Sequence, residues 1–132
     1  MTLAYICVLI AALLPILCAG IAKGGRFGQP RSKGGYDNHD PRAWLAKQTG
    51  YRARANAAQA NSFEALPLFI GAVLIAHQTQ ARQPLVDALA LSFVLLRLTY
   101  IGLYVADRAV ARSAIWFLAL ASCIALLFSS LL

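Results

Sequence analysis

Four long apolar runs, separated by polar segments, dominate the sequence. They fall at about residues 2–22, 50–77, 84–106 and 112–131. A helix needs roughly 20 residues to cross a bilayer core about 30 Å thick, and each run reaches that length. The first run carries no charged residue, and the last carries none after Arg112. The second carries only Glu64 between 56 and 76, and the third carries only Asp87 and Arg97. The pattern predicts an all-α integral membrane protein, folded as one bundle of four transmembrane helices that spans residues 1–132.

The segment 23–49 interrupts this pattern. It contains Lys23-Gly-Gly, Pro30, Ser32-Lys-Gly-Gly35 and Asp40-Pro41, and glycine and proline at this density break helices. We therefore predict a loop between the first two helices, with the second helix beginning near Thr49 or Gly50. The other connections, 78–84 and 107–112, are short enough to join antiparallel neighbours.

Composition supports a membrane location. Hydrophobic residues make up 60% of the chain and charged residues 13%, which excludes an ordinary soluble domain. Basic residues follow the first apolar run, whereas a signal peptide carries them before it, so we expect this run to remain as a helix.

The distribution of charge predicts the orientation. Eight of the twelve basic residues lie between the first apolar run and Asn56, in the connecting segment and the first turns of the second helix: Lys23, Arg26, Arg31, Lys33, Arg42, Lys47, Arg52 and Arg54. Short loops rich in Lys and Arg stay cytoplasmic, so both termini are expected outside. The net charge of +7 is thus first a topology signal and second an attraction to anionic lipid. We do not expect a nucleic-acid partner.

Polar residues recur at helical spacing within two of the apolar runs. Arg54, Asn61 and Glu64 fall on one face of the second helix, because their spacing of seven and ten residues matches whole turns. Intramembrane polar groups are costly in lipid and mark functional positions. Pro67 lies one turn after Glu64. It lacks the amide that would bond the carbonyl of Phe63, and it is expected to kink the helix.

The third helix repeats this arrangement. Arg97, Tyr100, Tyr104 and Arg108 share one face, so the two stripes are expected to face each other or a wet cleft. Glu64 and Arg97 are then the natural ion pair. Such a pair either belongs to a functional site or only holds the two helices together.

The residues along these helices resemble the MAPEG family, the membrane-associated proteins of eicosanoid and glutathione metabolism. The resemblance rests on Gln59-Ala-Asn61-Ser-Phe-Glu64-Ala-Leu-Pro67-Leu-Phe69, on Arg97 and Tyr104, and on Arg112-Ser113 at the start of the fourth helix. It covers all four helices. It implies a homotrimer of four-helix subunits, with glutathione bound between neighbouring subunits near the cytoplasmic face.

Two features depart from the best-known members of that family. Ala57 stands where the eicosanoid-forming members usually carry an arginine, and the glycine-rich loop with Asp37-Asn-His-Asp-Pro-Arg42 resembles a bacterial branch. The resemblance therefore implies a bacterial inner-membrane protein and does not imply leukotriene or prostaglandin synthesis.

The resemblance also suggests individual roles. Carried over position by position, it implies glutathione contacts from five residues, Gln59, Asn61, Glu64, Tyr104 and Arg112. Arg54 and Lys23 are further candidates for the two glutathione carboxylates, and Arg97 of the second stripe completes the candidate binding set. Glutathione has two carboxylates and one ammonium, and Glu64 is the only acid of the central stripe.

The candidate catalytic group is Arg112, with Ser113 and Tyr104. A guanidinium beside a thiol favours the thiolate, which is the nucleophile. Ser113 could donate a second hydrogen bond, and the first turn of the fourth helix is expected to offer free backbone amides. The alternative for Arg112 is a basic residue that marks the membrane interface.

These features predict a glutathione-dependent transferase or peroxidase acting on a lipophilic electrophile or hydroperoxide. A small four-helix exporter using Glu64 is the main alternative, although exporters of this size usually place their essential acid in the first helix. A non-catalytic membrane protein that binds a thiol compound is the third possibility.

Other reactive residues are weaker candidates. Cys7, Cys18 and Cys123 are expected to be small apolar residues of the bundle. The trio Asp37, His39 and Asp40 could hold a metal, but a hydrophilic turn fits that segment better, and we predict no metal site. His77, Trp44 and Trp116 are expected at the membrane interfaces.

Overall fold

The computed structural model describes residues 1–132 and contains helices and no strand. Its four long helices are α1 (Leu3–Lys23), α3 (Gly50–Gln78), α4 (Gln83–Val105) and α5 (Ala109–Leu127). Its short helical segments are η1 (Arg31–Lys33), α2 (Pro41–Ala46) and η2 (Ser129–Leu131). All four long helices are long and apolar enough to cross a membrane. The predicted all-α bundle of four membrane helices is therefore confirmed.

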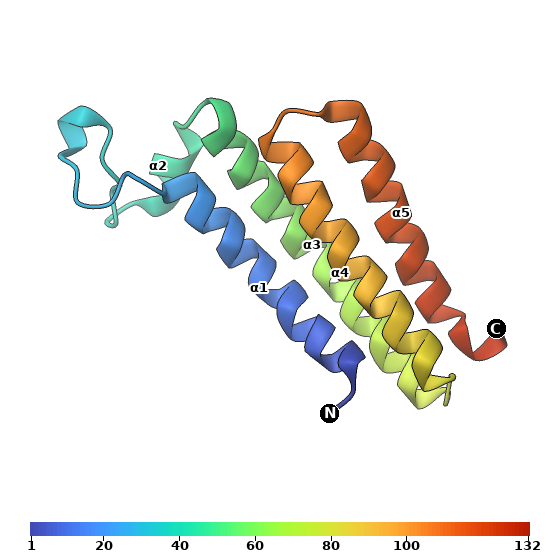
Figure 1. The fold of residues 1–132 in the computed structure, drawn as a ribbon. Coiled ribbons are helices and arrows are strands. Elements are labelled where there is room, and N and C mark those ends of the chain that lie inside the picture. The colour runs from blue at the N-terminus through green and yellow to red at the C-terminus, as the bar shows by residue number, and fades with distance from the viewer.

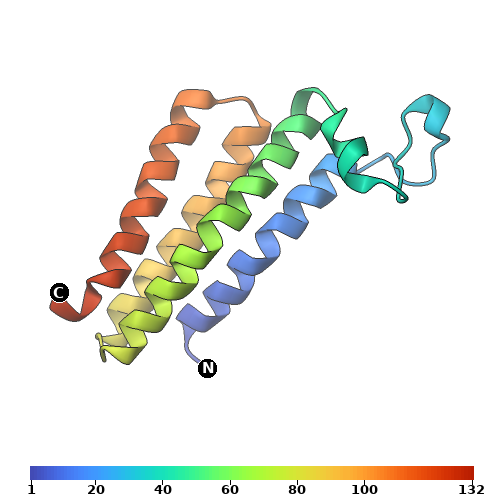
Figure 2. The ribbon, with the colours of Figure 1, turned by 180° about the vertical axis from the view of Figure 1, so that it is seen from behind.

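The long helices run side by side, with both termini at one end and the loop that carries α2 at the other (Figures 1 and 2). α1 packs mainly on α3, and α5 packs mainly on α4. α3 and α4 also contact each other and so form the centre of the bundle. Large apolar side chains are exposed along all four helices, as expected for a surface that lipid or another subunit covers.

The core is built mostly from small residues. Ala4, Ala72, Ala76 and Ala90 are fully buried, and alanine lets helix backbones approach closely. Larger groups fill the middle, where the ring of Phe69 on α3 stacks on that of Phe93 on α4 with centroids 4.0 Å apart. α3 continues as one helix through Pro67.

Polar contacts hold the helices at the end near the termini. Asp87 on α4 accepts a hydrogen bond from the backbone amide of Ala4 at 2.8 Å, and another from Gln83 at 2.8 Å. Thr2 and His77 are joined at 3.2 Å between Oγ1 and Nε2. Asp87 thus satisfies one of the free amides of the first turn of α1, where a negative charge is favourable.

The opposite end uses an arginine for the same purpose. The guanidinium of Arg52 on α3 donates to the carbonyls of Ala22 and Gly24, at 2.8 and 2.7 Å. These carbonyls belong to the last turn of α1, which lacks helical partners for its acceptors. Both ends of α1 are therefore bound by charged side chains of other helices.

The structure differs from the sequence prediction in three local features. The predicted loop contains the short helix α2, which Asp40 caps by accepting from the amide of Ala43. Trp44 in this helix is buried against Tyr36, a contact that was not predicted. α5 begins at Ala109, three residues before the expected start, because the chain reverses in one tight turn at Asp107, which has a φ of 60°.

Removal of the carboxylate at Asp87 should loosen the end of the bundle near the termini. We expect Asp87→Ala to lower the free energy of unfolding by about 1–2 kcal/mol, because a partly buried amide loses its acceptor. Asp87→Asn keeps one acceptor and should cost less. Thermal unfolding in detergent measures both effects. Asp107→Asn removes an exposed carboxylate and is the control; equal unfolding temperatures for Asp87→Ala and Asp107→Asn would contradict the prediction.

Candidate functional site

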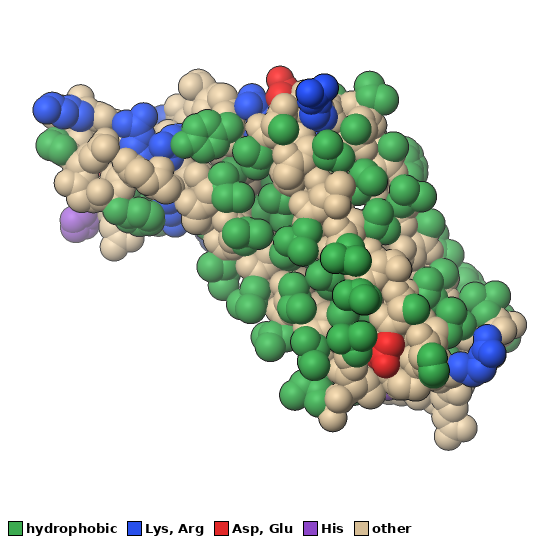
Figure 3. Space-filling view, in the orientation of Figure 1, with side chains coloured by type: hydrophobic (Ala, Val, Ile, Leu, Met, Phe, Trp, Pro, Cys, Tyr) green, Lys and Arg blue, Asp and Glu red, His purple; other side chains and the backbone are tan.

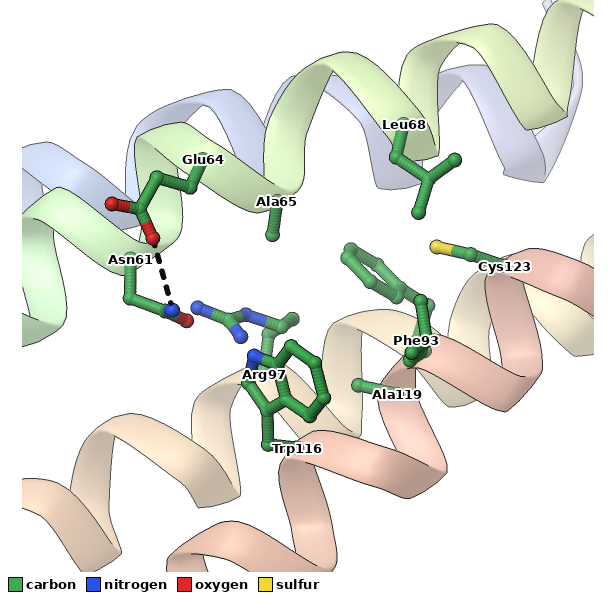
Figure 4. A pocket seen from close by; sticks show the side chains of 10 residues that line it. Asn61, Glu64, Ala65, Leu68, Phe93, Arg97, Trp116, Ala119 and Cys123 are labelled. Atoms are coloured by element: carbon green, nitrogen blue, oxygen red, sulfur yellow. Dashed lines mark hydrogen bonds between the residues drawn. The ribbon is translucent and has the colours of Figure 1, made fainter.

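A cavity of about 140 Å³ lies between α3, α4 and α5 (Figure 4). Three polar residues line it, Asn61, Glu64 and Arg97. The rest of its wall is made of Ala65, Leu68, Phe93, Trp116, Ala119, Leu120 and Cys123. The cavity therefore combines a charged region with an apolar wall inside the membrane-spanning part of the bundle.

The polar region contains an unfilled acceptor. The side-chain amide of Asn61 donates to Glu64 Oε2 at 3.3 Å, whereas the Oδ1 atom of Asn61 is buried without a hydrogen-bond partner. Figure 4 shows the guanidinium of Arg97 extending toward both residues. A buried acceptor without a partner costs about 1–3 kcal/mol, so a ligand with a donor group would stabilise this site.

Arg97 is the largest fully buried side chain, with 2% of its surface exposed. It donates to Ser62 Oγ at 3.4 Å and lies over the ring of Tyr100, 4.3 Å from the centroid. The predicted ion pair with Glu64 is not formed: the one salt bridge of the chain joins Arg31 and Asp37. Glu64 is exposed on α3 and bonded to Asn61, while Ser62 and Tyr100 hold Arg97.

A row of two aromatic rings between two cations connects the cavity to the end of the bundle opposite the termini. It consists of Arg97, Tyr100, Tyr104 and Arg112, and we call it the Arg–Tyr row. The rings of Tyr100 and Tyr104 meet edge to face at 5.6 Å, and Arg112 lies over Tyr104 at 4.2 Å. Such cation–π contacts are worth up to about 2 kcal/mol when desolvated. Arg108, which was expected on this face, is instead exposed in the turn before α5.

The surroundings of Arg112 differ from the expectation. Because α5 begins at Ala109, the amide of Arg112 already bonds the carbonyl of Arg108 at 2.9 Å and is not free. The hydroxyl of Ser113 donates to the carbonyl of Ala109 at 3.1 Å. The positive group that this site offers to a ligand is therefore the half-buried guanidinium of Arg112, beside the ring of Tyr104.

Gln59 lies apart from Asn61 and Glu64. It lines a second hollow of about 480 Å³ between α2 and α3, together with Arg42, Leu45, Ala53, Asn56, Ala57, Ala60 and Phe63. Residues two positions apart in a helix lie about 200° apart around its axis, so Gln59 and Asn61 point to opposite sides of α3. One subunit therefore does not bring all the predicted glutathione contacts to one place.

The two further cations of the candidate set lie at the same end of the bundle as Arg112. Arg54 Nε donates to the carbonyl of Val105 at 3.1 Å, which joins the beginning of α3 to the end of α4. Lys23 Nζ lies over the ring of Tyr36, 4.7 Å from its centroid. Arg54 thus remains beside the Arg–Tyr row, whereas Lys23, the last residue of α1, contacts the loop.

Three residues of the site were not predicted from the sequence. Trp116, which was expected at the membrane interface and not in the site, lines the cavity. Its position four residues after Arg112 places it on the same face of α5, which was an available signal. Cys123 also lines the cavity, and Ser62 supplies the hydroxyl that Arg97 contacts. The roles of Ser62 and Cys123 depend on how the helices pack and had no signal in the sequence.

The fold and the site define a class of protein: a bundle of four membrane helices with buried polar groups that can bind a ligand. The family model described as the MAPEG family matches residues 3–132, so the chain belongs to this family, as its sequence predicted. No curated protein and no solved structure matches it. Membership makes the chain an integral membrane protein of a glutathione-related family that includes transferases and peroxidases.

The position of Arg97 suggests that the residue serves a ligand at the expense of stability. A lone guanidinium within a membrane helix costs about 3 kcal/mol, whereas its ring contact returns at most about 2. We therefore expect Arg97→Met to raise the free energy of unfolding of the ligand-free protein by about 1 kcal/mol. Thermal unfolding in detergent measures the change, with Arg97→Lys as the variant that keeps the charge. Destabilisation by Arg97→Met would show that Arg97 is a structural residue.

Proposed function

We propose that this protein is a glutathione-dependent membrane transferase or peroxidase that acts on apolar electrophiles or hydroperoxides. The observation that carries the proposal is the arrangement of Glu64, Arg97 and Arg112 along one side of the bundle, linked by the Arg–Tyr row. Glutathione offers the complementary charges, since its ammonium suits Glu64 and its carboxylates suit arginines. Arg54, beside the row, is the further partner for a carboxylate.

We assign to Arg112 the role of stabilising the glutathione thiolate. A free thiol with a pKa of about 8.5 is only a few per cent ionised at neutral pH. A guanidinium next to the sulfur stabilises the thiolate and so increases the nucleophilic fraction. Tyr104 holds the guanidinium by its ring at 4.2 Å, which fixes the position of the charge. Ser113 assists only if its hydroxyl leaves the carbonyl of Ala109.

The chemistry follows from a thiolate held beside the lipid. In conjugation, the sulfur forms a bond to an electrophilic carbon, and the displaced electron pair leaves with the departing group or takes up a proton. In peroxide reduction, one hydroperoxide oxidises two glutathione molecules to the disulfide and yields an alcohol and water. An apolar substrate reaches this thiolate from the bilayer, where such compounds concentrate.

We also propose that the functional unit is a homotrimer with sites between subunits. Gln59 lies on the side of α3 opposite Asn61, in the hollow lined mainly by small residues and amides, and Ala57 borders the same hollow. Small side chains and amides favour contact between membrane helices. A neighbouring copy on this face would bring its own polar residues to Gln59. The proposed location is a bacterial inner membrane, with the basic loop in the cytoplasm.

Calorimetry on the detergent-purified protein tests glutathione binding. We expect saturable binding that Arg112→Ala or Glu64→Ala weakens at least about tenfold, or 1.4 kcal/mol, because each variant removes one charged contact. Arg82→Ala removes an exposed arginine from the opposite end of the bundle and should not change the affinity.

Absence of binding to the intact protein would remove glutathione chemistry as its function and would favour another thiol compound or an exporter that uses Glu64. Binding that Glu64→Ala and Arg112→Ala leave unchanged would instead place glutathione elsewhere in the bundle. Binding without turnover of any electrophile or hydroperoxide would indicate a non-catalytic protein.

Mixed oligomers test the site between subunits. If Gln59 and Glu64 contact one glutathione from different subunits, Gln59→Ala and Glu64→Ala homo-oligomers should each bind weakly. Co-expression of the two variants should then restore part of the full-affinity sites, because some interfaces pair two intact faces. Titration of the tagged, co-purified mixture measures this fraction. Failure of complementation, with stable mixed oligomers, would place the site within one subunit.

A further inference from the structure

Residues 26–36 form a closed hairpin that projects from the bundle beyond the end of α1 (Figures 1 and 2). The amide of Tyr36 donates to the carbonyl of Arg26 at 2.9 Å and closes it. Within it, the amide of Gly35 bonds the carbonyl of Pro30 at 3.1 Å, and a side chain at Gly35 would collide with the backbone of Gln29. The hairpin is therefore an ordered element, and glycine permits its close turn.

The hairpin presents one exposed aromatic residue on an aromatic support. Phe27 is 62% exposed and contacts Tyr36 edge to face at 5.2 Å. Tyr36 in turn contacts Trp44 of α2 at 5.2 Å, and Trp44 is buried. An exposed phenylalanine is unfavourable in water unless a partner covers it, whereas aromatic rings are favourable at the level of lipid headgroups.

Cations surround this ring. The segment 26–36 contains Arg26, Arg31 and Lys33 and no acid. Arg31 bonds Asp37 at 3.0 Å but remains 64% exposed at its side chain, and Lys33 is exposed. Figure 3 shows basic side chains gathered over this projecting loop, whereas the length of the bundle is mostly apolar. An exposed aromatic ring with a basic rim is the combination that anionic membrane surfaces attract.

The length of α1 places the hairpin at the level of the lipid headgroups. Its 21 residues extend about 31 Å at 1.5 Å per residue, which matches a bilayer core about 30 Å thick. Phe27 follows the last residue of α1, Lys23, by only four residues. A ring so close to the end of a spanning helix lies in the headgroup layer and not in bulk water.

We propose that the hairpin 26–36 is an anchor that docks on the anionic phospholipid headgroups of the leaflet beside the bundle, with Phe27 inserted and Arg31 and Lys33 on phosphates. This inference does not depend on the proposed function. It gives the cations of the hairpin a specific binding partner, whereas the general charge bias only places basic loops on one side of the membrane. The partner is a lipid with a net negative headgroup.

An introduced fluorophore tests the anchor. Trp44→Phe and Trp116→Phe remove both native indoles, and Phe27→Trp places one at the proposed contact. The protein is reconstituted in phosphatidylcholine brominated near the headgroups, with and without about one third phosphatidylglycerol. We expect bromine quenching of this indole to increase roughly twofold with the anionic lipid, because the attraction between opposite charges keeps the hairpin on the headgroups. High salt should reverse the increase.

Charge variants distinguish the hairpin from the rest of the loop. In the same background, Arg31→Gln with Lys33→Gln should abolish the increase in quenching. The matched pair Arg42→Gln with Lys47→Gln removes two exposed cations outside the hairpin and should retain it. Circular dichroism confirms that each variant is folded.

Four results would overturn the proposal. Equal quenching in both lipids would remove the preference for anionic headgroups. Equal loss of the quenching increase in both double variants would show that the whole loop, and not the hairpin alone, is attracted to the anionic lipid. Blue-shifted emission already in detergent, insensitive to either lipid, would show that a second copy of this chain covers Phe27. Reversal by added inorganic phosphate at constant ionic strength would point to a free anion as the ligand.

Discussion

The rest of the site is arranged around one buried charge, the guanidinium of Arg97. It lies in a helix that spans the membrane, is 2% exposed and has no carboxylate within salt-bridge distance. Its neighbours compensate it through a hydroxyl, an aromatic ring and the open space of the cavity. Each contact is weak, and together they leave donors of Arg97 directed at a space that a ligand can fill. A stable, ligand-free bundle has no need of such a group.

The Arg–Tyr row connects this buried charge to the end of the bundle opposite the termini. Tyr100 and Tyr104 separate Arg97 from Arg112, so two cations of like sign are held at the two ends of an aromatic spacer. Aromatic faces tolerate cations in a poorly hydrated region and add no negative charge that would neutralise them. The arginines therefore remain available to an anionic ligand, which is the property that a glutathione site requires.

α3 carries two different surfaces. One face contributes Asn61 and Glu64 to the cavity inside the bundle, and Gln59, on the side opposite Asn61, faces the hollow beside α2. Because helix geometry fixes these directions, the candidate glutathione contacts cannot converge within one subunit. The family resemblance implied a site between subunits, and the division of α3 into two faces supplies a physical reason for it. Ala57 lies seven residues before Glu64, on nearly the same face of α3, and it also borders the hollow beside α2.

The sequence by itself determined the helices, the end of the bundle that is basic, and the family, because apolar length, charge bias and residue spacing are local properties. It also identified Asn61, Glu64, Arg97 and Arg112 as unusual, since polar groups in apolar runs are costly. Only the tertiary structure decided their partners. Glu64 bonds Asn61 and leaves Arg97 to Ser62 and Tyr100, because contacts between helices depend on how far each side chain reaches across the bundle. The same packing brought Ser62 to Arg97 and Cys123 to the cavity wall, which residue spacing along one helix cannot reveal.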